Sequence, residues 1–432
     1  MSNCFRPARI LLPAAGIPLS QWACLACDQF TSQPEYWRRA AALVEGKPSA
    51  LHLVLPEIFL GGHDEQERIR RIQAAMKEYE GTVLERTVEG FVYVERTTTE
   101  GLVRQGLVGM VDLEKYSYTP GSRPAIRPTE NTVVERIPPR LAVRRGADLE
   151  LPHVMMLMSD PEDRILSGLA YERDNGKLPL LYEGQLMLGG GQIRGWAVED
   201  ADLCRTLSDA IEALGAQDAF DAAYPKAAGQ PPITLAVGDG NHSLATAKAY
   251  WEELKPTLSP AARKEHPARF CLVEVCNLHS AAIQIEPIHR VLFGVNGKQV
   301  QAGLTRYAQT RHLGMTRGAA EGQQHFMVVD APGHEMIFSF ATPAEPLAVG
   351  TAEDFVQWFL REEVDARVDY VHGDETARGM AGEDAVALIM PPFAKDDILK
   401  GVVLGGVLPR KTFSMGHAEE KRYYMEARRI RE

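Results

Sequence analysis

The stretch PPITLAVGDGNHSLATAKAYWEELK, residues 231–255, changes character near its middle. Its first half has strand character from Ile233 to Val237, and a helical pattern of apolar residues starts at about Ser243. The six residues from Gly238 onward read Gly-Asp-Gly-Asn-His-Ser. We therefore expect a strand, a tight polar turn and a helix in direct succession.

The turn itself is suited to an anionic ligand. Gly238 and Gly240 permit positive φ and the close approach of a backbone or a ligand. The helix that follows presents N–H groups and the positive end of its dipole, which favour a phosphate or a carboxylate. Asp239 could coordinate Mg²⁺ or accept a proton, and His242 could donate to a phosphate oxygen.

A structural role is the alternative for the same turn. Asn241 or Ser243 would then cap the helix, and His242 would be an ordinary surface residue. The turn is not a P-loop, because the pattern G-x-x-x-x-G-K-[ST] is absent.

Composition and charge limit the class of protein. The 432 residues are 45% hydrophobic and 24% charged, which is typical of a globular protein of two or three domains. The net charge of −11 argues against a large nucleic-acid or anionic-membrane surface. Without an 18-residue apolar run or a signal peptide, we expect a cytoplasmic protein. Six cysteines suggest no disulfide framework, and the Cys24–Cys27 pair lacks the second pair of a zinc ribbon.

Hydrophobic patterning predicts a mixed-sheet α/β or α+β protein. We expect helices over 64–80, 200–214 and 355–366, and strands over 51–55, 91–97, 102–113, 268–275, 281–286 and 368–374. Three regions are expected, 1–150, 151–300 and 301–432, although they could form one intertwined unit.

Three further polar stretches resemble ligand-binding loops. In EPIHRV, 286–291, we expect a loop after a strand, where Arg290 would clamp an anion or form a structural ion pair. The run LPRKTFSMGH, 408–417, and the segment IRPTENT, 126–132, would bind an anion and a polar ligand, respectively. For both stretches the alternative is a solvated surface loop.

Six stretches together resemble one known family, the domain-of-unknown-function family 1015. They are CDQFTSQPEYW, IRPTENT, VGDGNHSLATAK, EPIHRVL, YVHGD and LPRKTFSMG, and they run in the family's order over nearly the whole chain. Many relatives read Asp-Gly-His-His-Arg at the turn, whereas this chain has Ser243 in place of the arginine.

The resemblance implies a nucleotide-binding function. The Asp-Gly-x-His turn is similar to that of the ParB/sulfiredoxin-like fold, in which it contacts nucleotide phosphates at a helix start. Relatives resemble free-serine kinases, which transfer a phosphoryl group from a nucleotide to the serine hydroxyl. We therefore expect a ParB/sulfiredoxin-like nucleotide-binding core within a larger mixed-sheet protein, carried by 151–300.

These observations lead to one main hypothesis, a small-molecule phosphotransferase that uses ATP or ADP with Mg²⁺ and acts on free L-serine or a related metabolite. We expect no nucleic-acid or membrane partner and leave a homodimer open. The predicted roles are catalysis for Asp239, His242 and Glu130; phosphate binding for Gly238, Gly240, Asn241, Ser243, Arg290, Arg410, Lys411 and Thr412; substrate binding for Asp28, Arg127, Thr129 and His289; and Mg²⁺ binding for Asp239.

The alternative hypothesis is a non-catalytic nucleotide- or metabolite-binding regulator. The missing arginine after His242 favours it. DNA binding of the ParB kind is disfavoured by the net charge.

Overall fold

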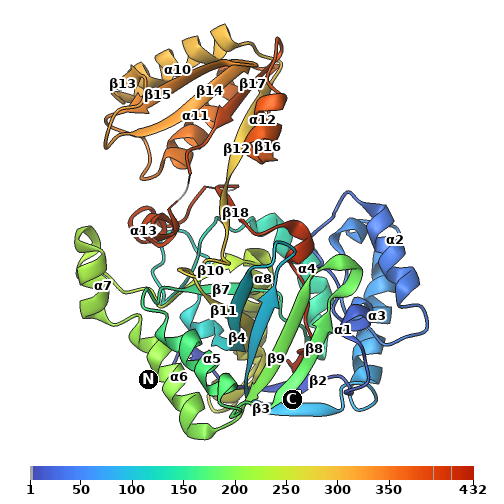
Figure 1. The fold of residues 1–432 in the computed structure, drawn as a ribbon. Helices are drawn as coiled ribbons and strands as arrows, with labels where there is room; N and C mark the ends of the chain where they lie inside the picture. The colour runs from blue at the N-terminus through green and yellow to red at the C-terminus, as the bar shows by residue number, and fades with distance from the viewer. Residues whose placement is uncertain (1–2, 393, 410) are drawn as a thin grey trace. The chain divides into compact units, whose positions relative to one another are not determined.

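The computed structural model describes residues 3–392, 394–409 and 411–432 (Figure 1). The chain forms two compact units. Unit 1 comprises Met1–Pro128, Thr132–Ile283 and Gly416–Glu432, and unit 2 comprises Thr129–Asn131 and Gln284–Met415. These limits differ from the three sequence regions expected above, because strand pairing joins segments that lie far apart in the chain.

Unit 1 is built on a mixed sheet in which the central path runs β5-β10-β7-β11-β4-β3-β9-β8 (Figure 1). Strand β1 pairs with β4, β2 pairs with β3, and β19 pairs with β6 in a separate ribbon. The pairs β10–β5 and β11–β7 are parallel, and the other pairs are antiparallel. The strands are β1 Phe5–Arg6, β2 Ala8–Leu12, β3 Arg86–Thr97, β4 Val103–Asp112, β5 Ile126–Pro128, β6 Leu149–Glu150, β7 Met155–Met158, β8 Leu180–Gln185, β9 Gln192–Val198, β10 Leu235–Asp239, β11 Phe270–Asn277 and β19 Arg428–Arg429.

Helices cover both faces of this sheet. Its α-helices are α1 Leu19–Trp22, α2 Pro34–Leu43, α3 Glu65–Tyr79, α4 Ile137–Arg145, α5 Arg164–Asp174, α6 Ala201–Ala213, α7 Gln217–Ala223, α8 Asn241–Leu254 and α9 Ala262–Glu265. Strand β3 shows why two layers are needed. Val92 and Val94 join one buried cluster while Phe91 and Tyr93 join another, since successive side chains of a strand point to opposite faces.

Unit 2 carries its own antiparallel sheet, in the order β13-β15-β14-β17-β12-β16, with β18 paired to β12. Its core holds Leu292, Phe326, Phe355 and Leu388. The elements are β12 Ile285–Phe293, β13 Met315–Arg317, β14 Gln324–Ala331, β15 His334–Phe340, β16 Arg367–His372, β17 Ala385–Ile389, β18 Phe413–Met415, α10 Gly297–Arg311, α11 Ala348–Glu362, α12 Asp374–Gly379 and α13 Lys395–Gly405.

Three predicted elements are wrong. The strand expected over 281–286 begins only at Ile285, because the residues before it form a turn in which the Ile283 N–H donates to the Ser280 carbonyl at 3.0 Å. Residues Ala50–Leu53 form a 3-10 helix rather than a strand, begun by Ser49, whose hydroxyl accepts the Leu51 N–H at 3.2 Å. Residues 286–291, expected as a loop, are the middle of strand β12. An isolated apolar run does not distinguish a strand from a short helix, and Pro287 is accommodated because it pairs near the strand's start with the short β18.

The mixed α/β class is confirmed, together with the helices near 64–80, 200–214 and 355–366 and the strand pair β3–β4. The ParB-like character of the core stays a prediction. Among the residues that the structure describes, every helix is too short or too polar to cross a membrane.

Candidate functional site

The turn after β10 is shaped by one glycine. Strand β10 shifts its register against β7 between Val237 and Asp239 and then ends. Gly240 adopts φ +77° and ψ 25°, in the left-handed region that favours glycine. A Cβ at this position would lie 3.0 Å from the Cα of Val154. The chain can therefore reverse into α8 here only with a residue that lacks a side chain.

Gly240 is also the N-cap of α8, so no side chain caps this helix at that position. The alternative in which Asn241 or Ser243 is the cap is wrong, because both residues lie inside the first turn. A 14-residue helix with a glycine cap directs N–H groups and a positive dipole toward whatever approaches its start. This geometry suits an anion.

A lysine and an aspartate meet at this helix start. The ammonium of Lys421 lies 3.0 Å from Oδ2 of Asp239, and both side chains are about three-quarters buried. Oδ1 of Asp239 accepts the N–H of Gly240 at 2.9 Å. Asp239 is thus held in place by its own turn and by a cation from the far end of the chain.

Backbone pairing brings that cation to the site. The Ala26 N–H donates to the Lys421 carbonyl at 2.8 Å, and the Tyr423 N–H donates to the Cys24 carbonyl at 3.0 Å. The same pairing places Asp28, two residues past Ala26, in the electrostatic field of Lys421.

Asp28 is ionised in this setting. Burial would raise the pKa of its carboxyl, but the imidazole of His153 and the ammonium of Lys421 together hold that pKa below its ordinary value. The carboxyl therefore carries a negative charge at neutral pH. Asp28 and Asp239 share Lys421 as a positive neighbour.

The first turn of α8 adds hydroxyl and imidazole groups. Oγ of Ser243 lies 2.9 Å from Nε2 of His153, whose ring packs edge-on against Tyr423 with centroids 5.0 Å apart. The Val133 N–H donates to Nε2 of His242 at 3.2 Å, so that nitrogen is unprotonated in this contact.

A pocket of about 150 Å³ opens beside Ser243. Its wall includes Ser243, Thr246, His153 and Tyr423 together with apolar residues of several elements. The helix start, the Lys421–Asp239 pair and this pocket are parts of unit 1. We refer to them together as the α8 site.

Backbone carbonyl groups surround the guanidinium of Arg127. Its guanidinium donates to the carbonyl oxygens of Pro124, Pro231 and Pro232 at 2.9, 2.5 and 3.3 Å. Burial, with a smaller effect from Arg123, lowers its pKa to about 10. Arg127 ties the loop before β5 to the entry of β10, so its predicted contact with substrate competes with three backbone bonds.

Arg290 and His289 lie buried within strand β12 of unit 2. Nε of Arg290 is 3.2 Å from Oε2 of Glu353, and the guanidinium carbon lies 5.4 Å from the Tyr370 ring centroid. Nδ1 of His289 accepts the Met390 N–H at 3.1 Å, and burial lowers its pKa. These contacts fit the structural ion pair that was the alternative for Arg290.

The remaining predicted residues belong to unit 2 or lie outside the described residues. The Thr129 carbonyl accepts the Leu408 N–H at 2.7 Å, and Glu130 bridges to the same residue. Thr412 donates to the Pro409 carbonyl at 2.6 Å, and Lys411 has φ +57° in an exposed loop. Arg410 lies outside the described residues. The roles of Glu130, Thr129, Lys411 and Thr412 stay predictions.

Sequence reasoning missed Lys421 and His153. Lys421 belongs to the charged run EEKRYY and directly follows a short 3-10 helix, Ala418–Glu420. No local pattern links residue 421 with residue 239. Only the pairing of residues 421–423 with 24–26 does so.

The residues present suit an anionic group such as a phosphate. Across the described ranges, no three His, Cys, Asp or Glu side chains gather to hold a metal. Asp28 and Asp239 could contribute one or two oxygens to Mg²⁺ that arrives with phosphates, as is common for this ion. The uncapped helix start and Lys421 suit the phosphates themselves.

The fold and the site define a mixed α/β protein with a candidate anion site at a glycine-capped helix start. The chain belongs to the family described as "Protein of unknown function (DUF1015)", which matches residues 6–365. The family expected from the six sequence motifs is thereby confirmed. No curated protein matches the chain.

Several solved structures are similar. A free serine kinase in complex with AMP shares 11% identity at a TM-score of 0.36, covering 74% of this chain and 91% of its own. A conserved hypothetical protein from Pyrococcus furiosus shares 10% identity at a TM-score of 0.34, and the match covers 74% of this chain and 94% of that protein. C-terminally truncated SbnI from Staphylococcus aureus shares 12% identity at a TM-score of 0.36, and the match covers 72% of this chain and 82% of that protein. The AMP is a ligand of the free serine kinase in that structure.

Proposed function

We propose that unit 1 binds ATP or ADP at the α8 site and transfers a phosphoryl group to the hydroxyl of a small metabolite, such as free L-serine. The observation that carries the proposal is the ammonium of Lys421 beside Asp239 at a helix start without a side-chain cap. Phosphoryl transfer depends mainly on positioning and on neutralising phosphate charge, and these groups supply both.

The reaction balances with the groups at hand. The acceptor oxygen forms a bond to the terminal phosphorus of the nucleotide, and the bond from that phosphorus to the bridging oxygen breaks. The nucleotide leaves with one phosphoryl group fewer. The proton of the acceptor hydroxyl passes to a carboxylate, for which Asp239 is the candidate. Lys421 and the N–H groups of α8 would hold the phosphate oxygens.

Replacing Lys421 tests the binding step. A hydrogen bond to a charged group contributes about 1.5–3 kcal/mol, so Lys421→Ala should weaken ADP binding roughly 10- to 100-fold. Isothermal titration calorimetry with ADP and MgCl₂ measures this. Lys177→Ala is the matched control, since that ammonium is exposed and paired with Glu172 at 2.8 Å.

Turnover is tested separately by following ATP with ³¹P NMR in the presence of single amino acids and related alcohols. The proposal is abandoned if the wild-type protein neither binds nor consumes a nucleotide. Equal weakening of ADP binding by Lys421→Ala and Lys177→Ala would show that Lys421 does not contact the bound nucleotide.

A non-catalytic binding function is the second candidate, and one observation favours it. Both oxygens of Asp239 are engaged, one by Lys421 and one by the Gly240 N–H, so the carboxylate would have to break a contact to take the proton of an acceptor hydroxyl. This reading predicts saturable ADP binding without turnover, with a stoichiometry that Asp239→Asn leaves unchanged. A loss of measurable turnover in Asp239→Asn would favour the phosphotransferase instead.

A further inference from the structure

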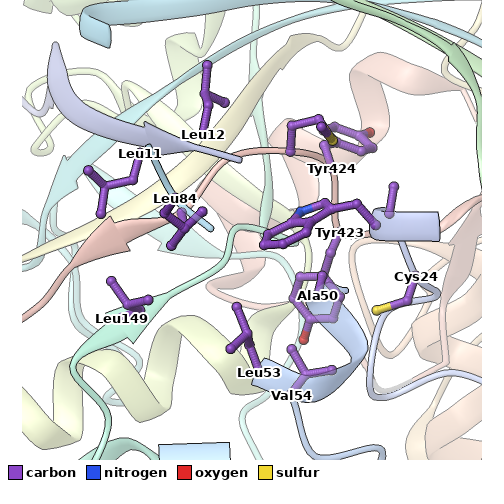
Figure 2. Close-up of a cluster of buried hydrophobic side chains, with 14 of the residues drawn as sticks. Leu11, Leu12, Cys24, Ala50, Leu53, Val54, Leu84, Leu149, Tyr423 and Tyr424 are labelled. Carbon is purple, nitrogen blue, oxygen red and sulfur yellow. The ribbon is translucent and has the colours of Figure 1, made fainter. Parts of the chain in front are cut away.

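The pocket beside Ser243 differs in character from the helix start that adjoins it. Apolar side chains from separate parts of unit 1 form most of its wall, among them Leu53, Val54, Met76, Leu149 and Leu272. Figure 2 shows Leu53, Val54 and Leu149 in the same buried cluster as Tyr423. Such a wall offers no hydrogen bonds to a strongly polar ligand.

The charged residues at the wall are already paired. Arg140 forms an ion pair with Glu57, and Arg144 lies 2.6 Å from Oε2 of Glu150. Glu150 in turn pairs with Arg428 at 2.7 Å. Each of these charges has a partner of opposite sign among the described residues, although Nε of Arg144 makes no hydrogen bond with them. Charges that are already paired do not select an ionic ligand.

Helix α8 contributes two hydroxyl groups to the wall. Ser243 and Thr246, one turn apart on α8, place their hydroxyls at the pocket wall together with His153. Oγ of Ser243 contacts Nε2 of His153 at 2.9 Å, and Oγ1 of Thr246 donates to the His242 carbonyl at 2.7 Å. Each hydroxyl oxygen keeps lone-pair capacity for a ligand donor.

The size of the pocket sets the size of its occupant. A cavity of about 150 Å³ lined by aliphatic and aromatic side chains is large enough to bind benzene. An apolar group of benzene or leucine size that binds there removes apolar surface from water and gains dispersion contacts with this wall.

We propose that this pocket binds the apolar body of a small hydroxyl compound, an aliphatic or aromatic group of about six heavy atoms, with the hydroxyl toward Ser243 and His153. The proposal rests on the proposed function for the choice of a hydroxyl as the polar end. It deepens that function by assigning the acceptor to apolar alcohols rather than to small polar ones such as serine.

The test uses the full chain without nucleotide and four probes: benzyl alcohol, 3-methylbutan-1-ol, glycerol and L-serine. Saturation-transfer NMR should show saturable binding of the first two, with neither glycerol nor L-serine displacing them. Val143→Phe places a ring into the pocket from α4 and should weaken benzyl alcohol binding at least tenfold. Val364→Phe, at a 91% exposed valine of unit 2, should leave it unchanged.

A second variant guards against misfolding. Leu60→Phe narrows the pocket from a half-buried position on another segment and should have the same effect as Val143→Phe. The proposal is overturned if the apolar alcohols fail to bind the wild-type protein, if both narrowed variants bind them unchanged, or if L-serine displaces them.

ADP titrations on the same proteins separate this inference from the proposed function. Binding of benzyl alcohol without any ADP binding would keep the pocket assignment and refute the nucleotide site. ADP binding without any alcohol binding would do the reverse.

Discussion

Glu426 is a buried carboxyl outside the α8 site, and its protonation should make the stability of the protein depend on pH. The residue is fully buried, and Oε1 accepts the hydroxyl of Tyr182 at 2.5 Å, while Oε2 has no hydrogen-bond partner among the described residues. Burial raises the pKa of this carboxyl from 4.5 to about 7, although the Tyr182 bond opposes the shift. A carboxyl of this kind favours its neutral form in the folded state.

The sign of the pH effect follows from the direction of that shift. Because the folded-state pKa lies above the unfolded one, the stabilisation is fully present below pH 4.5 and is lost as pH rises through about 7. Glu426→Gln keeps a neutral group at every pH. We expect the variant to gain stability relative to wild type as pH rises, by about 3 kcal/mol at pH 8.

Urea unfolding at pH 5, 6, 7 and 8 measures this difference. Glu419→Gln is the control, since it removes an exposed carboxylate from the same segment and should add no such slope. A constant difference between Glu426→Gln and wild type across the four pH values would show that the carboxyl does not titrate in this range.

At the scale of elements, the β10–α8 turn depends on Gly240. Alanine there meets two costs, the left-handed backbone at φ +77° and a Cβ that would lie 3.0 Å from the Cα of Val154. The backbone cost alone is about 1–2 kcal/mol. We expect Gly240→Ala to lower the free energy of unfolding by more than this backbone cost. The variant should also weaken ADP binding, because the N–H groups of α8 shift.

Gly229 provides a matched control for that substitution. It has nearly the same backbone angle, φ +78°, but a Cβ would meet nothing within 4 Å. Gly229→Ala should therefore cost only the backbone contribution and leave ADP binding unchanged. Equal losses in the two variants would show that Val154 moves aside and that the turn tolerates a side chain.

The same turn shows what local pattern can predict. The strand, the turn and α8 follow from residues 231–255 alone, since glycine, apolar alternation and helical spacing act over a few residues. The stretch 286–291 was misassigned, because its burial comes from β16 and β17, more than 70 residues further on. Polar residues such as His289 and Arg290 favour a loop when only the sequence is considered. The ion pair of Arg290 with Glu353, which allows its burial in a strand, cannot be inferred from the local sequence.

The candidate site follows the same division. Asp239 and Ser243 could be proposed from their position after a strand, and Asp28 from a family motif. Lys421 and His153 could not be proposed. Lys421 reaches the site through the pairing of residues 421–423 with 24–26, and His153 precedes β7, which pairs with β10. Charge and residue type identify candidates, but only tertiary contacts decide which of them meet.

At the scale of the whole molecule, unit 1 is closed by the last residues of the chain. Strand β19 pairs with β6, and Leu11 and Ala427 exchange two backbone hydrogen bonds of 2.8 and 2.9 Å. The side chains of Tyr423, Met425 and Ile430 are buried in the same core as β2. The C-terminal segment is therefore part of the fold of unit 1.

Arg428 provides the test of this closure. Its buried guanidinium pairs with Glu150 at 2.7 Å and donates to the carbonyls of Pro267 and Phe270 at 3.0 and 2.6 Å. Removing one partner of a buried ion pair costs about 3–5 kcal/mol. Glu150 keeps Arg144 at 2.6 Å, but the Pro267 and Phe270 carbonyls lose their donor. We expect Arg428→Ala to lower the unfolding free energy of unit 1 by that amount.

Tryptophan fluorescence can report on unit 1 alone in a Trp358→Phe background, because the other four tryptophans lie at residues 22, 37, 196 and 251. Arg431→Ala is the control, since that exposed guanidinium lies 3.6 Å from Asp148 and a surface pair contributes about 0–1 kcal/mol. If Arg428→Ala lowers the unfolding free energy no more than Arg431→Ala does, the C-terminal segment contributes little to the stability of unit 1. A large and specific loss would instead mean that residues 416–432 close the core that also holds Lys421 beside Asp239, so folding and the α8 site depend on the same contacts.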